Sequence, residues 1–370
     1  MKSTKILVKT KSKTYPIYFG NRIINQTNRL IRKNLPDTKK ICILIDKKLP
    51  NLLSKKLIKS LKKYNPKIIK LSVNEKTKSF KVANKIINFL LKENYNRSDC
   101  VIALGGGILG DLAAFIASIT KRGIKFVNIP TTLLAQSDAS IGGKTAVNSH
   151  QGKNLIGTFY QPEFVLIDTS SLNSLPRREL ICGYGEILKH ALISDKKFFY
   201  WLTNNAKKII NKRDNNLLKT AIMKSCKIKS KIVSMDEKEK NLRMILNFGH
   251  TFAHGFEGAK NFSKKLNHGE AVLLGMATAS QLSYEKKILP LNDLNLVKKH
   301  YNDLNLPMKI KKKFKKKEIS KIIYFIKKDK KNYNEKINLI LIKKIGKVTK
   351  PNKYKIDSEN LKKFLNKQYH

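Results

Sequence analysis

The chain has 370 residues, of which 41% are hydrophobic, and this length is sufficient for two domains with buried cores. No stretch offers roughly 18 consecutive uncharged apolar residues, and the first residues lack the apolar core of a secretory signal, so we expect no membrane span and no signal peptide. The formal net charge of +51 raises the question of nucleic-acid binding. The basic residues are mostly lysines spread along the whole chain, without a recognisable DNA- or RNA-binding motif, and we expect no specific nucleic-acid partner.

Short apolar runs alternate with amphipathic segments through the first 175 residues. Strands are predicted at residues 3–19, 41–45, 68–73, 100–104 and 125–129, and helices at residues 21–33, 55–63, 80–91 and 112–120. A uniformly apolar run such as Ile41–Ile45 is typical of a parallel strand that helices cover on both faces. The alternation predicts an α/β domain with a parallel sheet at residues 1–175.

After Pro176 the pattern changes to long helical periods, and strand alternation returns only at residues 336–342. We therefore predict a mainly α-helical second domain at residues 176–370. The four cysteines are far apart and include no C-x-x-C pair. This usage favours reduced thiols and a cytoplasmic protein.

A glycine-rich segment follows the predicted strand at residues 100–104. Gly105, Gly107 and Gly110 match G-x-G-x-x-G, whose glycines let the backbone approach a pyrophosphate at a helix N-terminus. Tight strand-to-helix turns use the same glycines for purely structural reasons. The acidic residue expected about 20 positions later is absent, and Asp46, at the end of an earlier strand, is the better candidate for binding a ribose.

Polar groups next to glycines continue through residues 130–154. Lys144 and Lys153 each adjoin a glycine, an arrangement that suits phosphate or carboxylate contacts, although solvated loop lysines are an ordinary alternative. Further along, Glu186 and Lys189 lie three residues apart on an otherwise apolar predicted helix. Glu186 is either the ion-pair partner of Lys189 or a carboxylate ligand of a zinc site.

Residues 241–270 carry three of the seven histidines, His250, His254 and His268. Helical spacing predicts that Arg243, Asn247, His250 and His254 lie along one face of a helix. His250 and His254 have the spacing at which two imidazoles share a zinc ion, with His268 as a further ligand. The glutamate of the zincin motif H-E-x-x-H is missing, and two core histidines plus a loop histidine are the alternative interpretation.

Ten blocks together resemble the 3-dehydroquinate synthase family, one of the sugar-phosphate cyclase families. They occur in family order between residues 46 and 331, and the combination is specific although each block alone is not. The blocks are E-x-x-KS at 75–79, GGGILGD at 105–111, KRG at 121–123, PTTLLAQSDASIGGKTAVN at 130–148, GKN at 152–154, LPRRE at 175–179, GEILKH at 185–190, LNFGHTFAH at 246–254, HGEAV at 268–272 and DKK at 329–331.

The resemblance implies an N-terminal Rossmann-like NAD-binding α/β domain, a mainly α-helical C-terminal metal-binding domain and an active site in the cleft between them. It assigns the metal, Zn²⁺ or Co²⁺, to Glu186, His250 and His268. His254 then becomes a catalytic or substrate-positioning group instead of a ligand. Arg122 matches an arginine that the family lends to the phosphate pocket of the neighbouring subunit, which implies a homodimer.

The resemblance also implies two larger sets of site residues. Those that contact NAD are Asp46, Asn74, Glu75, Lys78, Gly106, Gly107, Ile108, Leu109, Gly110, Asp111, Thr131, Thr132, Lys144, Lys153, Ser171, Leu172, Asn173 and Ser174. Those that act on the substrate are Asp138, Lys144, Asn154, Lys189, Lys229, Arg243, Asn247, His254, Lys330 and the partner-directed Arg122.

The family's substrate is 3-deoxy-D-arabino-heptulosonate 7-phosphate, a small anionic sugar phosphate, and its reaction belongs to the shikimate pathway of aromatic amino acid biosynthesis. The implied mechanism is transient oxidation by NAD, elimination of phosphate, re-reduction and intramolecular aldol closure, with a net lyase outcome. Two related alternatives are another sugar-phosphate cyclase, such as a 2-deoxy-scyllo-inosose synthase, and a metal- and NAD-dependent polyol dehydrogenase. A basic nucleic-acid-binding protein is the alternative from a different class.

Overall fold

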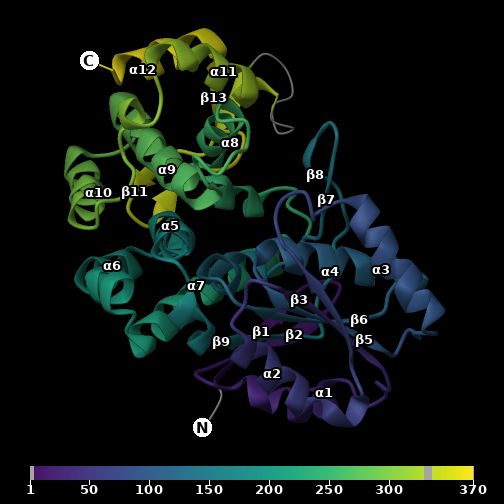
Figure 1. Cartoon of the computed structure of the whole chain (residues 1–370). Coiled ribbons are helices and arrows are strands. Elements are labelled where there is room, and N and C mark those ends of the chain that lie inside the picture. The colour runs from purple at the N-terminus through teal and green to yellow at the C-terminus, as the bar shows by residue number, and fades with distance from the viewer. Residues whose placement is uncertain (1–3, 329–335, 370) are drawn as a thin grey trace. The chain divides into compact units, whose positions relative to one another are not determined.

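The structure is a computed structural model that describes residues 4–328 and 336–369. The chain forms two compact units (Figure 1). The first comprises Met1–Pro176 and Leu218–Glu237, and the second comprises Arg177–Leu217 and Lys238–His370. Residues 218–237 thus belong to the first unit, whereas the sequence predicted one continuous second domain from residue 176.

A sheet in the order β1-β2-β9-β6-β5-β3-β4 forms the centre of the first unit. Its strands are β1 (Thr4–Lys9), β2 (Thr14–Gly20), β3 (Ile41–Asp46), β4 (Lys67–Leu71), β5 (Cys100–Gly105), β6 (Lys125–Pro130) and β9 (Phe164–Asp168). β1 and β2 pair antiparallel, and the remaining neighbours in this sheet pair parallel. The predicted parallel α/β fold is confirmed. The predicted strand at residues 3–19 is wrong in one respect, because a turn closed by Thr10 N donating to Lys13 O (3.0 Å) splits it into a hairpin.

Helices cover both faces of this sheet, as the apolar strands required. They are α1 (Thr27–Asn34), α2 (Asn51–Ser60), α3 (Phe80–Lys92) and α4 (Gly107–Ile119). Because successive strand residues point to opposite faces, Ile102 packs in one core with α1 and α2, whereas Val101 packs in the other with α3 and α4. Burial on both faces explains why β3 and β5 are apolar without alternation.

The segment between β6 and β9 contains structure that the sequence did not predict. A hairpin of β7 (Val147–Ser149) and β8 (Gly152–Ile156) follows a π-helical turn at Ala135–Ala139. Helix α7 (Asn215–Met235) packs on that turn through its side chains: Cys226 Sγ lies 3.3 Å from Gln136 O, and Lys229 Nζ lies 2.7 Å from Asp138 O. These contacts explain why most of α7 belongs to the first unit.

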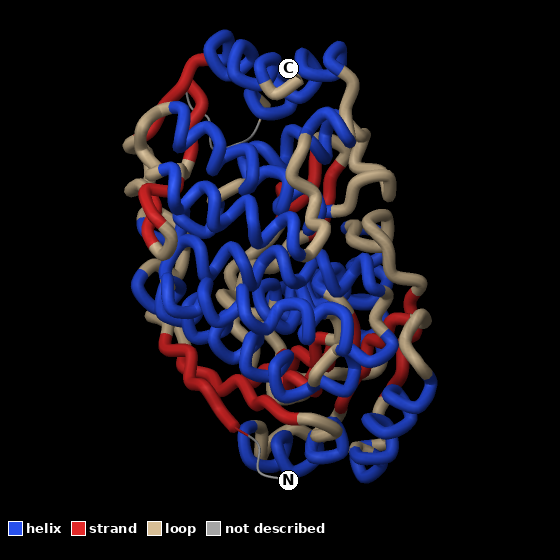
Figure 2. The backbone as a smooth tube through the Cα atoms, turned by 90° about the vertical axis from the view of Figure 1, so that its left-hand side faces the viewer, coloured by secondary structure: helices blue, strands red, loops and turns tan. Residues whose placement is uncertain are grey.

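The second unit is mainly helical, as predicted, and helices dominate its backbone trace (Figure 2). Its α-helices among the described residues are α5 (Arg177–Ser194), α6 (Lys196–Lys207), α8 (His250–Ala259), α9 (His268–Glu285), α10 (Leu291–Asp303), α11 (Ile319–Lys327) and α12 (Ser358–Lys367). The predicted strand at residues 336–342 is two short strands, β10 (Lys336–Leu339) and β11 (Ile342–Lys344), which pair with β13 (Tyr354–Asp357) and β12 (Lys347–Val348). None of the described helices is both long and apolar enough to cross a membrane.

The predicted single helix through Arg243, Asn247, His250 and His254 is wrong. Leu242–Asn247 is a 3₁₀ helix, and α8 begins only at His250 after Gly249, whose φ is 78°. This left-handed conformation favours glycine and changes the direction of the backbone before α8. Arg243 and Asn247 therefore do not share a helix face with the two histidines.

Replacing Gly249 by alanine is expected to destabilise the protein. A Cβ at this position would lie 2.6 Å from Met276 Cγ and 2.7 Å from Met276 N, and the left-handed backbone adds strain. We expect the free energy of unfolding, measured by urea denaturation, to fall by about 2–4 kcal/mol. Gly107→Ala, at the start of helix α4, is the control, because a Cβ there would lie at an ordinary 3.4 Å from its nearest neighbour, Ala139 Cβ. Equal stability of the two variants would contradict this account of Gly249.

Candidate metal and cofactor sites

Helix α5 carries a buried ion pair in the second unit. Glu186 and Lys189 are one turn apart, and the side chains of both are 2% exposed. The Lys189 ammonium lies against Glu186 Oε2, as the sequence allowed. The charge of Glu186 is therefore partly balanced from its own helix, while its other oxygen, Oε1, points away from Lys189 toward α8 and α9.

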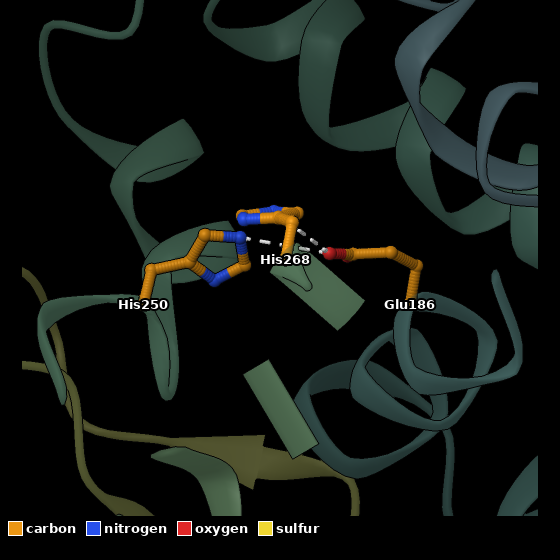
Figure 3. A group of neighbouring side chains, drawn as sticks. All are labelled: Glu186, His250 and His268. Carbon is orange, nitrogen blue, oxygen red and sulfur yellow. Dashed lines mark ion pairs between the residues drawn. The ribbon is translucent and has the colours of Figure 1, made fainter. Parts of the chain in front are cut away.

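Two histidines converge on that second oxygen (Figure 3). His250 opens α8 and His268 opens α9. Their Nε2 atoms lie 3.6 Å and 3.8 Å from Glu186 Oε1. One ligand atom from each of Glu186, His250 and His268 lies within 4.8 Å of the others. The structure thus brings together the three residues that the resemblance implied as metal ligands.

The second nitrogen of each ring contacts an acceptor. His250 Nδ1 lies 3.3 Å from Phe248 O, and His268 Nδ1 lies 3.0 Å from Glu257 Oε2. A carbonyl or carboxylate at Nδ1 requires a hydrogen on that nitrogen, so a neutral ring presents the lone pair of Nε2. Two imidazole nitrogens and one carboxylate oxygen form the donor set of open catalytic zinc sites, and this chemistry fits Zn²⁺ or Co²⁺.

Burial and charge oppose each other at His268. Burial disfavours the imidazolium, but the charge and hydrogen bond of Glu257, with a smaller contribution from Glu186, outweigh it and raise the pKa of His268. A metal ion at Nε2 has to displace the proton there. If these residues bind a metal ion, we expect its affinity to fall as the pH falls.

The remaining predicted residues of the second unit occupy separate positions. His254 lies on α8 with its ring centroid 5.9 Å from that of His250, and it is not a member of the group formed by Glu186, His250 and His268. Arg243 is 2% exposed. Asn247 Nδ2 donates to Glu239 Oε1 at 2.9 Å. Lys330 lies outside the described residues.

Glu239 and Glu257 were missed from the sequence. Glu239 stands in an alternating run of acids and lysines, which predicts only a solvated surface. Glu257 follows His250 by seven residues, so helical periodicity alone would have placed the two on one helix face. Nothing in the sequence indicated that His268, from another helix, would meet Glu257 there.

In the first unit, the strand order creates a switch point between β3 and β5. From β3 the chain passes to β4 on one side, and it then returns to β5 on the other side. In parallel sheets, ligands bind outside the carboxyl ends of the strands at such a point. Asp46 ends β3, and the glycine segment at residues 105–110 follows β5 into α4, so the predicted ribose and pyrophosphate contacts flank the switch point. Thr131 N donates to Gly105 O at 2.9 Å, which places the β6 loop beside them.

Lys78 connects the predicted cofactor residues to Asn154. Its ammonium is buried and lies 2.6 Å from Asp111 Oδ2 on α4, and it also contacts Asn154 on β8. Burial raises the pKa of Asp111, and the charge of Lys78 opposes that shift. Beside it, Glu75 pairs with Lys153 at 3.4 Å. The structure therefore joins residues 74–78, Asp111 and the β7–β8 hairpin into one network.

Lys229 lies on helix α7, and the predicted residues described next lie on loops and turns of the first unit. Asp138 pairs with Lys229 Nζ at 2.9 Å, and Lys144 is exposed. Ser171 Oγ accepts from Gln136 Nε2 at 3.0 Å in the 3₁₀ segment Thr169–Ser174, which also contains Leu172, Asn173 and Ser174. Arg122 is exposed and has φ 62° in the turn that follows α4. That these residues bind substrate, NAD or a partner stays a prediction.

Replacing Lys189 by methionine is expected to make the protein dependent on metal for stability. The substitution leaves the buried Glu186 carboxylate without its ammonium, and breaking a buried pair costs about 3–5 kcal/mol. We expect the apo protein to melt at a clearly lower temperature and zinc to raise that temperature more in the variant than in the wild type. Lys197→Met, at an exposed position of α6, is the control. A Lys189→Met protein as stable as the control would contradict the role given to the ion pair.

Comparisons with known proteins agree with this arrangement. Two family models, described as 3-dehydroquinate synthase N-terminal and C-terminal, match residues 68–182 and 183–332. A curated 3-dehydroquinate synthase of Pelagibacter ubique is 53% identical over 342 residues, covering 92% of this chain and 93% of the relative. One from Thermodesulfovibrio yellowstonii is 42% identical over 340 residues, covering 91% and 92%.

Solved structures of related enzymes have the same fold. A 2-deoxy-scyllo-inosose synthase complexed with carbaglucose-6-phosphate, NAD⁺ and Co²⁺ has a TM-score of 0.83 at 24% identity, covering 98% of this chain and 99% of that one. A 2-epi-5-epi-valiolone synthase from Streptomyces hygroscopicus subsp. jinggangensis with NAD⁺ and Zn²⁺ bound has a TM-score of 0.83 at 25% identity, covering 97% and 98%. With family models matching both halves and relatives above 40% identity along nearly its whole length, the chain belongs to the 3-dehydroquinate synthase family.

Proposed function

We propose that this chain converts 3-deoxy-D-arabino-heptulosonate 7-phosphate to 3-dehydroquinate and inorganic phosphate, a carbon–oxygen lyase reaction that depends on NAD and a divalent metal. The observation that carries the proposal is the convergence of Glu186, His250 and His268 in a chain of this family. The donor set suits Zn²⁺ or Co²⁺ and leaves coordination positions for a substrate oxygen. Related enzymes of the same fold are described with these metals bound.

NAD has a matching position in the first unit. The switch point between β3 and β5, with Asp46 and the glycine segment on its two sides, is where parallel sheets bind dinucleotides. When bound, the metal supplies a Lewis acid for a substrate hydroxyl, and NAD supplies an acceptor that takes a hydride and returns it.

We assign basic residues of both units to the anionic groups of the substrate. Lys189 and Lys229 are each paired with a carboxylate, which holds these buried ammonium groups in place. The buried Arg243 offers a rigid guanidinium that suits bidentate binding of a carboxylate or phosphate. His254, which is outside the ligand group, is assigned a proton-transfer or substrate-orienting role.

The proposal extends to the assembly. We assign Arg122 to the phosphate site of a second copy, because it matches an arginine to which the family gives that role and its side chain is exposed. The active species is then a homodimer in the cytoplasm, with the small sugar phosphate as substrate and no specific nucleic acid or membrane as partner.

The test is release of inorganic phosphate from 3-deoxy-D-arabino-heptulosonate 7-phosphate with less than stoichiometric NAD⁺. We expect more phosphate than the NAD⁺ supplied and no build-up of NADH. A chelator should abolish the release, and added zinc or cobalt should restore it. Turnover of a different sugar phosphate alone would indicate another cyclase, and NADH accumulating on a simple polyol would indicate a dehydrogenase.

Glu186→Gln is expected to lower phosphate release at limiting metal by at least about 100-fold. The variant replaces a ligand charge by a neutral amide, and even residues that only support a ligand contribute about 10–100-fold to metal affinity or activity. Glu359→Gln is the matched control, because that carboxylate is exposed on α12 and pairs with Lys363 alone among the described residues. Full activity of Glu186→Gln at limiting metal would refute the ligand assignment.

A further inference from the structure

Helix α8 carries a buried carboxylate in addition to His250. Glu257 follows His250 by two helical turns, so both side chains leave the same face of the helix. Glu257 is 7% exposed, and its Oε2 lies 3.0 Å from His268 Nδ1. One helix therefore supplies both a ligand of the metal group and the acceptor that contacts a second ligand.

The ring of His268 lies between two carboxylates. Its Nδ1 contacts Glu257, and its Nε2 faces Glu186 Oε1 at 3.8 Å. A carboxylate that accepts from Nδ1 fixes both the tautomer and the rotation of the ring. The nitrogen left to bind a cation is then the one that faces Glu186 and His250.

The two histidines differ in the support that they receive. His250 Nδ1 meets a neutral backbone carbonyl at 3.3 Å, whereas His268 Nδ1 meets a charged carboxylate at 3.0 Å. Both histidines begin a helix, His250 α8 and His268 α9, where the positive end of the helix dipole opposes a bound cation. The negative charge of Glu257 beside Nδ1 offsets that opposition at His268, whereas the neutral carbonyl of Phe248 does so less at His250.

We propose that Glu257 is a positioning residue for the metal group: it holds His268 with Nε2 toward Glu186 and His250 and strengthens that nitrogen as a donor to a divalent cation. The inference rests on the proposed function, in which these three residues bind Zn²⁺ or Co²⁺. A buried acid that served packing alone would contribute to the stability of the apo protein without changing metal affinity. The two roles therefore separate in one experiment.

The experiment measures the dissociation constant of Co²⁺ and Zn²⁺ for the full-length apo protein by competition with a chromophoric chelator. Glu257→Ala removes the acceptor, and we expect the affinity to fall about 10–100-fold. Glu257→Gln keeps the shape and an oxygen acceptor but loses the charge, so its affinity should lie between those of the wild type and the alanine variant. The visible absorption of the Co²⁺ protein should change in Glu257→Ala, because the ring is no longer fixed.

Glu318→Gln and Glu318→Ala are the matched controls. Glu318 pairs with Lys260, the C-cap residue of α8, at 2.9 Å from Nζ, but it touches none of the three ligands. Both controls should keep the wild-type metal affinity. The melting temperature of each apo protein is measured alongside, and where Glu257→Ala is unstable, the near-isosteric Glu257→Gln decides.

The outcomes distinguish the inference from the function on which it rests. Wild-type affinity in both Glu257 variants, with binding abolished by His268→Ala, would overturn the inference and leave the proposed metal site intact. Affinity lost equally in the Glu257 and Glu318 variants would also overturn it, because any damage to α8 would then suffice. A wild-type protein that binds neither metal would overturn the proposed function together with the inference.

Discussion

The buried carboxylate of Glu186 is the constraint on which the second unit depends. The Glu186 residue is 1% exposed, and its charge requires compensation, which comes from Lys189 on the same helix. Imidazoles from two other helices face its second oxygen. The histidines reach Glu186 because the helices approach closely: a Cβ on Gly269 would lie 2.3 Å from Cys182 Cα of α5, and one on Gly275 would lie 2.2 Å from Gly249 O. Packing and the candidate chemistry are therefore set by the same glycines.

In the first unit, the corresponding constraint is the strand order. The chain leaves β3 toward β4 on one side and returns to β5 on the other side, which creates a crevice at the carboxyl ends of β3 and β5. Asp46 and the glycine segment lie on the two sides of this position. Lys78 then extends this edge toward β8 by joining Asp111 and Asn154. A cofactor bound at this edge, as we propose for NAD, would lie beside Lys78 and the residues that it contacts.

Local sequence patterns predicted the helices and strands. They did not predict which residues from different helices would come together. The apolar runs identified β3 and β5, and the apolar periodicity placed Glu186 and Lys189 one turn apart on α5. The helix expected through residues 243–254 is not continuous, because Gly249 adopts a left-handed conformation. Gly249 packs closely against Met276, a residue distant in the sequence, and the local pattern does not show that contact. Spacing alone also left His254 as a ligand candidate, since the meeting of His250 with His268 depends on how α8 and α9 pack. The three metal ligands were predicted from the resemblance to the family. The contact between Glu257 and His268 became visible only in the structure.

The excess of lysine distinguishes the buried carboxylates from those on the surface. The chain has 77 basic and 26 acidic residues, so a carboxylate on its surface finds lysines nearby and forms pairs that contribute little. Glu186 and Glu257 differ, because each is withdrawn from solvent and directs an oxygen at an imidazole nitrogen. Such a position costs desolvation that a surface pair avoids. In a chain with so few acids, a carboxylate held at that cost beside a histidine is better explained by what the histidine binds than by the stability of the fold.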